Sequence, residues 1–156
     1  MSFHLQSYVL LQDLAARNVM VDSRETCKVA DFGLLREIPK DNTIYQATTE
    51  MPWPIRWMAP ESLDNREFSP ASDVWSFGVL LWEMYYPNKL PYTELNNVQV
   101  PMKVHLGHRL SIPTAYPSTV ASIMKACWQR KPEKRPSFLL ISTLLTNMTL
   151  QLDNEA

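Results

Sequence analysis

Three polar residues in the first part of the chain have types and a spacing that could hold a metal ion beside a reacting hydroxyl group. Asp13, Asn18 and Asp31 form the pattern Asp-x4-Asn-x12-Asp. Mg²⁺ is commonly bound by one or two carboxylates together with phosphate oxygens of a substrate. Asn18 and Asp31 could supply oxygen ligands of this kind, and Asp13 could orient a nucleophilic hydroxyl. Because Asp and Asn are also common in turns, the spacing alone leaves turn-forming roles open.

Two short β-type runs, residues 19–21 and 27–29, must position these side chains. The polar stretch 22–26 between them predicts a small hairpin. Asn18 precedes the first run and Asp31 follows the second. Antiparallel pairing would therefore bring an amide oxygen and a carboxylate to the same end of the hairpin.

The rest of the chain predicts a mostly helical fold. Residues 1–10 have the pattern of the end of an apolar helix, and the proline-rich stretch 39–60 predicts a long irregular loop. Nearly all β structure would then precede this loop. Three helices are expected to begin at Ser69-Pro70, where a cap residue precedes proline, at Ser118 and at Ser137. The first is the most apolar, with hydrophobic residues at helical spacing: Val74, Phe77, Leu81 and Met84.

Length and composition limit the classes of function. The 156 residues fit one domain, and the formal net charge of −1 argues against nucleic acid as a partner. The longest apolar stretch, residues 77–82, is far shorter than the roughly 20 residues of a membrane span, so no membrane segment is predicted in this chain. Cys27 and Cys127 lie far apart without metal-ligand spacing and are expected to be reduced, buried thiols.

Glycine is scarce, with only three residues, at positions 33, 78 and 107. Both common phosphate-binding loops, G-x-G-x-x-G and G-x-x-x-x-G-K, need glycines more closely spaced than these. A nucleotide would therefore have to be held in another way, or mostly by residues outside these 156.

Several motifs resemble, in order and spacing, those of protein kinases. They correspond to the catalytic loop, the DFG motif, the APE motif and three more distal segments: Leu11–Asn18 (LQDLAARN), Asp31-Phe32-Gly33, Ala59-Pro60-Glu61, residues 72–79, Cys127-Trp128 and residues 135–138. The triplet Ala15-Ala16-Arg17 and the segment 54–58 are similar to those of protein tyrosine kinases, with the triplet in the order more usual in receptor-type members. The resemblance runs from about residue 1 to residue 150.

This resemblance implies a fold and a reaction. The fold would be the C-terminal lobe of the α+β protein-kinase domain over residues 1–150, mostly α with a small β-hairpin, followed by a tail at 151–156. The family reaction converts ATP and a protein tyrosine into ADP and phosphotyrosine. ATP and Mg²⁺ would be the cofactors and a tyrosine-containing protein or peptide the partner, at an intracellular location.

The resemblance also assigns roles to residues. Asp13 would orient the tyrosine hydroxyl or accept its proton, with help from Arg17, while Asn18 and Asp31 would hold Mg²⁺. Met20 and Ala30 would contact the nucleotide together with Asp31, and the loop that supports the substrate would contain Pro54, Arg56 and Trp57. A buried ion pair between Glu61 and Arg135 would hold the lobe together. Asp73 would anchor the catalytic loop.

Some positions depart from the family pattern. Leu11-Gln12 stand where most members have His-Arg; Leu11 could still pack against Phe32, but neutral Gln12 cannot form the charge-assisted contacts by which that arginine binds a phosphorylated loop. Tyr45 occupies the region where regulatory phosphotyrosines occur, so its phosphorylation is expected to activate this protein less than a typical relative. Pro101, within the predicted helix 94–105, should make that helix start late or kink.

The Gly-rich loop, the phosphate-pairing Lys and its Glu partner, which belong to the N-terminal lobe of the family, have no counterpart in these residues. The sequence therefore predicts a fragment or truncated isoform that is inactive by itself. A pseudokinase or docking module acting through its helical surface is the alternative, and Leu11-Gln12, Pro101 and the missing lobe favour it.

Overall fold

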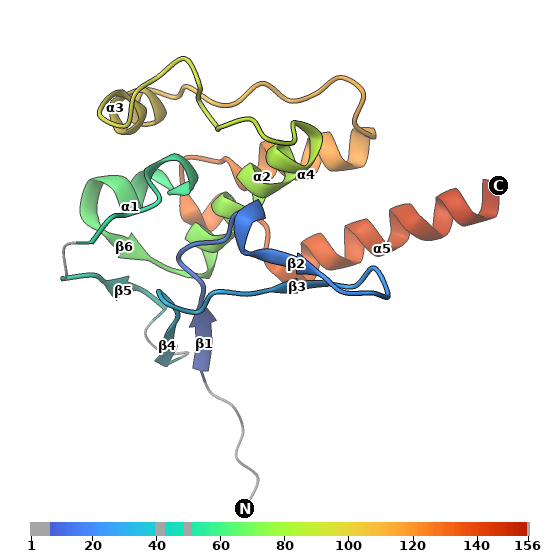
Figure 1. The fold of residues 1–156 in the computed structure, drawn as a ribbon, viewed down its shortest axis with the longest axis horizontal. Coiled ribbons are helices and arrows are strands. Elements are labelled where there is room, and N and C mark those ends of the chain that lie inside the picture. Colours follow the sequence, from blue (N-terminus) through green and yellow to red (C-terminus); the bar gives the residue numbers. More distant parts are fainter. Residues whose placement is uncertain (1–6, 40–42, 49–50, 156) are drawn as a thin grey trace, which may run out of the picture.

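The computed structural model describes residues 7–39, 43–48 and 51–155 and is mostly helical, with short strands (Figure 1). The strands are β1 Ser7–Leu10, β2 Val19–Val21, β3 Cys27–Val29, β4 Arg36–Pro39, β5 Tyr45–Gln46 and β6 Glu67–Phe68. The helices are α1 Pro60–Asn65, α2 Pro70–Tyr85, α3 Gln99–His105, α4 Ser118–Cys127 and α5 Phe138–Glu155, with 3-10 turns at Ala16–Asn18, Ile55–Trp57 and Pro132–Lys134.

The described strands form three antiparallel pairs, β1 with β4, β2 with β3 and β5 with β6. The β2–β3 pair confirms the predicted hairpin. The helical prediction for residues 1–10 is wrong over Ser7–Leu10, because this segment pairs with β4 and its last residue, Leu10, enters a small core beside Ile38 and Phe68. Residues 1–6 lie outside the described residues.

The stretch 39–60 is less irregular than its prolines predict. It contains β5 and the 3-10 turn Ile55–Trp57, and β5 pairs with β6, which follows the stretch in sequence. The expectation that nearly all β structure precedes the loop is therefore wrong for β5 and β6. Strands of two residues carry too little hydrophobic alternation to be visible in sequence.

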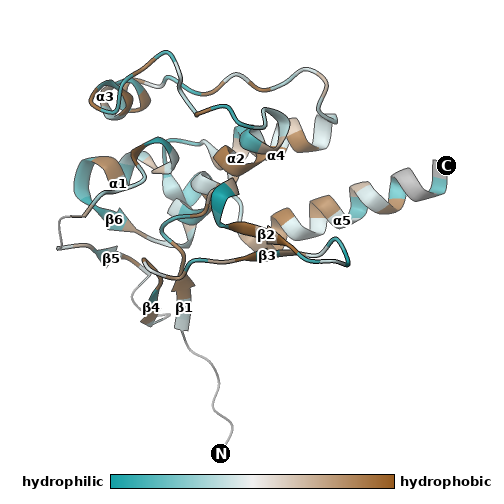
Figure 2. Cartoon of the chain, in the orientation of Figure 1, coloured by the Kyte–Doolittle hydropathy of each residue, from teal (hydrophilic) through white to brown (hydrophobic). Residues whose placement is uncertain are grey.

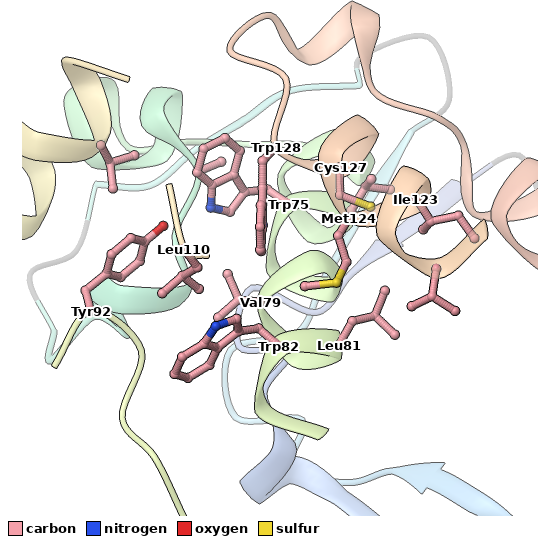
Figure 3. Packing of buried hydrophobic residues seen from close by; sticks show 14 of the residues in the cluster. Trp75, Val79, Leu81, Trp82, Tyr92, Leu110, Ile123, Met124, Cys127 and Trp128 are labelled. Atoms are coloured by element: carbon pink, nitrogen blue, oxygen red, sulfur yellow. The ribbon is translucent and has the colours of Figure 1, made fainter. Parts of the chain in front are cut away.

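Helix α2 runs through the main core, as its apolar pattern predicts. Its N-terminus is closed by a capping box in which the Ser69 and Ser72 side chains and backbone N–H groups bond reciprocally, with Pro70 in the first turn. Figure 3 shows α2 packed against α4, with Trp75 and Val79 beside Met124, Cys127 and Trp128.

Gly78 permits this close packing of α2 on α4. A Cβ atom at Gly78 would lie 2.7 Å from Nε1 of Trp128 and 2.8 Å from Cβ of Cys127. Both distances are below normal contact, so the glycine is required by the approach of the two helices.

The other predicted helix starts are placed with mixed accuracy. The Ser137 hydroxyl accepts the N–H of Leu140 at the start of α5, as a cap does. Helix α4 begins at Ser118, as predicted, but Pro117 occupies the cap position and Ser118 makes no capping bond. Helix α3 starts late, as expected, with Pro101 in its first turn, where a missing N–H breaks no helical hydrogen bond. Helix α5 continues past position 150 to Glu155.

The two cysteines differ in exposure. Cys127 is buried, but Cys27 is exposed, so the prediction of a buried thiol is wrong at Cys27. Both strands of its hairpin are largely exposed, including apolar Met20, Val21 and Val29. Figure 2 shows β2 in the brown of hydrophobic residues. Among the described residues, no helix is long and apolar enough to cross a membrane.

Candidate active site

The β2–β3 hairpin brings Asn18 and Asp31 to the same end. Val19 pairs with Val29, and the Ala30 N–H donates to the Asn18 carbonyl at 2.7 Å. Asp31 follows directly, in the left-handed backbone region at φ 60°. Its Oδ1 accepts the Gly33 N–H at 3.1 Å, which closes a tight turn after the hairpin.

Asn18 joins this end of the hairpin to Asp13. Its Nδ2 donates to the Asp13 carbonyl at 2.8 Å and to Asp13 Oδ2 at 3.0 Å, and the residue is buried. Because both Asn18 amide protons are donated to Asp13, the Asn18 Oδ1 atom points away from Asp13 and remains a free acceptor. The structure thus joins Asn18 to Asp13 as well as to the start of the hairpin, a contact that the sequence pattern did not predict.

The donor atoms at this site fit Mg²⁺. Within the described part of the chain, Asn18 Oδ1 and Asp31 Oδ2 accept no hydrogen bond, and both are hard oxygen ligands. Among all residues that the structure describes, there is no group of three or more His, Cys, Asp or Glu side chains that could surround a metal ion. An ion held here would therefore need phosphate or water oxygens to complete its coordination.

Asp13 also contacts Arg17, four residues later. Arg17 Nη2 donates to Asp13 Oδ1, and the guanidinium carbon lies 4.4 Å from the centre of the Trp57 ring. Asp13 is thus held by Asn18 on one oxygen and by Arg17 on the other, while its side chain stays 19% exposed. The ring contact places the 3-10 turn Ile55–Trp57 next to Asp13 through Arg17.

Arg56 holds that turn in place through hydrogen bonds from its guanidinium to other residues of the chain. Its guanidinium donates to the Asn97 side chain and to the carbonyls of Pro91, Tyr92 and Leu95 at 2.7–2.9 Å. A groove of about 460 Å³ opens beside the turn. It is lined by Trp53, Pro54, Ile55, Arg56, Trp57, Leu90, Asn96 and Asn97.

Asp73 of α2 lies behind the segment that precedes Asp13. Its carboxylate accepts the backbone N–H groups of Leu11 at 2.8 Å and Gln12 at 3.0 Å, and Gln12 has a positive φ of 61°. Burial raises the pKa of the Asp73 carboxyl to about 6, while the two backbone hydrogen bonds act in the opposite direction. This buried acceptor fixes the backbone just before Asp13.

The Gln12 side chain points inward rather than toward solvent. The residue is 5% exposed, and its Nε2 has no hydrogen-bond partner among the described residues. The small space around it is lined by Met58, Ala59, Ser62, Phe68, Ser72, Asp73 and Ser76. Position 12 is thus a buried polar site whose amide is not satisfied.

Glu61 and Arg135 form a bidentate ion pair. Arg135 Nη1 and Nη2 donate to the two carboxylate oxygens at 2.6 and 2.8 Å, and the Arg135 side chain is fully buried. The contact joins α1 to the segment before α5, 74 residues later.

The other expected site residues lie around this centre. Met20 on β2 is 60% exposed and Ala30, after β3, is half-buried. Tyr45 lies in β5, half-buried, with the Arg36 guanidinium 6.0 Å from its ring centre. Phe32 is 60% exposed and belongs to neither core cluster, so its packing against Leu11 stays a prediction.

Two site residues were missed in the sequence. The Ser76 hydroxyl donates to the Trp57 carbonyl at 2.8 Å, and the Glu83 carboxylate accepts from Ala16 and from the Trp57 ring. Ser76 and Glu83 follow Asp73 by three and ten residues, so all three lie on one face of a helix. This spacing was the feature of the sequence that could have indicated their role.

Comparison of the sequence with known proteins identifies a family and several relatives. A profile of the family described as protein tyrosine and serine/threonine kinase matches residues 1–145. The chain is 44% identical over 131 residues to tyrosine-protein kinase Shark of Drosophila melanogaster, covering 84% of this chain and 14% of the relative. It is 45% identical over 138 residues to human tyrosine-protein kinase Srms, covering 88% and 28%.

A third relative is ephrin type-A receptor 6 of Rattus norvegicus, 42% identical over 137 residues, covering 88% of this chain and 13% of that protein. The chain therefore spans less than a third of the length of each of these relatives.

Proposed function

Because this chain belongs to the protein tyrosine kinase family, we propose that residues 1–150 form the C-terminal lobe of a kinase domain, followed by a short tail. The complete domain transfers the γ-phosphate of ATP to a tyrosine hydroxyl of a protein. The oxygen of the phenol attacks the γ-phosphorus, the bond to the β-phosphate oxygen breaks, and ADP leaves.

The observation that carries this proposal is the double tether of Asp13. With one oxygen on Arg17 and the other on the Asn18 amide, the carboxylate has a fixed orientation and remains partly exposed. A carboxylate in this setting can orient the phenol hydroxyl and take its proton as the new bond forms. Arg17, which lies over Trp57, helps to place the hydroxyl.

Asn18 Oδ1 and Asp31 Oδ2 are the atoms that would hold Mg²⁺ together with the ATP phosphates. The ion, when bound, would neutralise negative charge on the phosphoryl group during its transfer. Met20 and Ala30, at the open hairpin, would contact the nucleotide beside Asp31.

The 156 residues contain no Gly-rich phosphate loop. Met20, Val21, Val29 and Phe32 are at least 37% exposed and provide an apolar floor for a nucleotide base or for a second lobe rather than a closed pocket. We therefore propose that the 156-residue chain alone does not catalyse phosphate transfer and needs a nucleotide-binding lobe for activity.

A docking module without catalytic activity is the second candidate. The buried and unsatisfied amide of Gln12 favours it, because this residue occupies the position of an arginine that contacts a phosphorylated loop in most relatives. In that case the groove beside Trp57 would bind a protein without transfer of phosphate.

The two candidates separate in one experiment. The 156-residue chain and a fusion that adds the N-terminal lobe of a tyrosine kinase are assayed for transfer of radiolabelled phosphate to a poly-Glu-Tyr polymer. We expect transfer by the fusion only, and loss of at least 100-fold on Asp13→Asn, within the roughly 10²–10⁴-fold contributed by a general base. Asp22→Asn, in the hairpin turn, is the matched control and should retain activity.

Transfer by the isolated chain would contradict the need for a second lobe. A folded fusion that binds ATP and Mg²⁺ but transfers no phosphate would favour the docking module.

A further inference from the structure

Glu83, in the last part of α2, contacts two loops at once. Its Oε2 accepts the backbone N–H of Ala16 at 2.9 Å and the indole N–H of Trp57 at 2.9 Å. Ala16 begins the 3-10 turn after Asp13, and Trp57 ends the 3-10 turn beside the groove. One carboxylate oxygen therefore bridges segments that lie about forty residues apart in sequence.

Glu83 is one of three α2 side chains that hold these loops. Asp73 accepts the N–H groups of Leu11 and Gln12, and Ser76 donates to the Trp57 carbonyl. Spacings of three and seven residues put the three side chains on one face of a helix. Asp73 and Ser76 each hold one loop, whereas Glu83 holds both.

The bridge leads to Asp13 through the Trp57 ring. The Glu83 bond at Nε1 orients the indole, the Arg17 guanidinium lies 4.4 Å from the ring centre, and Arg17 pairs with Asp13. Charge-assisted hydrogen bonds such as those of Glu83 are stronger than neutral ones. Releasing the indole would therefore free Arg17 and loosen one of the two tethers of Asp13.

We infer that Glu83 is a positioning residue that fixes the distance between the loop carrying Asp13 and the loop that supports the substrate. This inference rests on the proposed kinase function for its effect on catalysis. The bridge itself is a property of the chain and is testable without any phosphate transfer.

The first test uses nuclear magnetic resonance on the 156-residue chain. Glu83→Ala should move the Ala16 amide and the Trp57 indole N–H resonances upfield and speed their exchange with water. The Arg17 side-chain resonances should lose the ring-current shift due to Trp57. Glu83→Gln, whose amide oxygen can still accept both bonds, should largely restore all three signals, and Glu133→Ala, an exposed site on the turn Pro132–Lys134, should change none.

The second test measures kinetics in the fusion with a nucleotide-binding lobe. Misplacing reacting groups by about 1 Å can cost on the order of 10²-fold in rate. We expect Glu83→Ala to lower kcat at least tenfold and to leave the KM for ATP within about twofold, with Glu83→Gln in between. A purely stabilising role would lower the melting temperature and leave kcat of the folded enzyme unchanged.

The outcomes separate this inference from the proposed function. Unmoved Arg17 signals in Glu83→Ala, or an unchanged kcat in an active fusion, would overturn the positioning role. If the unmutated fusion transfers no phosphate, the kinase proposal fails, and the Arg17 signals still decide whether Glu83 positions the two loops.

Discussion

Arg135 uses every N–H of its guanidinium, two of them on the carboxylate of Glu61 at 2.6 and 2.8 Å. The other three donate to the carbonyls of Gln129, Ala71 and Arg130. A fully buried arginine needs this complete set of acceptors, because each unpaired polar group would cost free energy. The pair fastens α1, α2 and the segment before α5 at one point.

Glu61→Ala should therefore destabilise the fold strongly. It leaves a buried, uncompensated guanidinium, and breaking such a pair on one side typically lowers the free energy of unfolding by about 3–5 kcal/mol. Urea denaturation at pH 7 measures the loss. Lys28→Ala, which removes an exposed ion pair with Asp22, is the control and should cost about 1 kcal/mol or less. A similar small cost for both variants would mean that the buried pair does not hold the helices together.

Gly78→Ala tests the approach of α4 to α2. Alanine is favoured over glycine in a helix by about 1 kcal/mol, but here its Cβ would lie 2.7 Å from Trp128 Nε1. Overpacking of this kind typically costs about 1–3 kcal/mol, so we expect a net loss of stability in urea denaturation.

Met84→Ala on the same helix is the matched comparison for Gly78→Ala. Met84 is 65% exposed, and the variant should change stability by about 0.5 kcal/mol or less. A Gly78→Ala protein as stable as the native chain would show that α4 can move away without penalty.

Gln12→Arg tests whether position 12 limits regulation through Tyr45. Arg36 already lies near the Tyr45 ring, at 6.0 Å from its centre. An arginine at position 12 would add a second cation for a phosphate, through charge-assisted hydrogen bonds. In the active fusion, phosphorylation of Tyr45 should raise the rate more in Gln12→Arg than in the native sequence, as measured by initial rates before and after phosphorylation.

The stability of position-12 variants provides the control for that experiment. Gln12→Leu removes the unsatisfied Nε2 and should keep or increase the free energy of unfolding. Because it adds no charge, it should not change the gain on phosphorylation. An equal gain in the native sequence, in Gln12→Leu and in Gln12→Arg would contradict a regulatory role for Gln12.

Much of the site was predictable because its residues are close in sequence. Asn18 and Asp31 flank a short hairpin, and antiparallel pairing alone brings them to one end. The α2 helix was predictable from its cap and its apolar spacing. Both features are encoded within a window of about fifteen residues.

Contacts between distant segments were not predictable in this way. The helical prediction fails at β1 because its partner, β4, lies about thirty residues later, and a four-residue apolar run fits either element. The role of Glu83 depends on where α2 ends relative to two loops, which only tertiary packing determines. Gln12 is buried and has a positive φ, which its residue type does not favour, so its conformation was not predictable from its type.

Asp73→Asn should change how stability depends on pH. Burial raises the pKa of Asp73 from 3.8 to about 6 in the fold, so between about pH 4 and pH 6 the native state binds a proton that the unfolded chain lacks. The contribution of this group to stability therefore increases as the pH falls through that window. When the pH is lowered from 7 to 4, the free energy of unfolding of the native chain should rise by about 2 kcal/mol relative to that of Asp73→Asn. Urea denaturation of both proteins at each pH measures this difference.

Asp22→Asn provides a comparison of opposite sign. The hydrogen bonds of Asp22 with Lys28, Thr26 and Arg24 lower its pKa below 3.8, so its stabilising contribution is present above that pH and is lost on further acidification. The native chain should therefore lose stability relative to Asp22→Asn as the pH falls below about 4, while it gains relative to Asp73→Asn. Shifts of the same sign in both variants would indicate a general acid effect and would contradict the assignment of the upper window to Asp73.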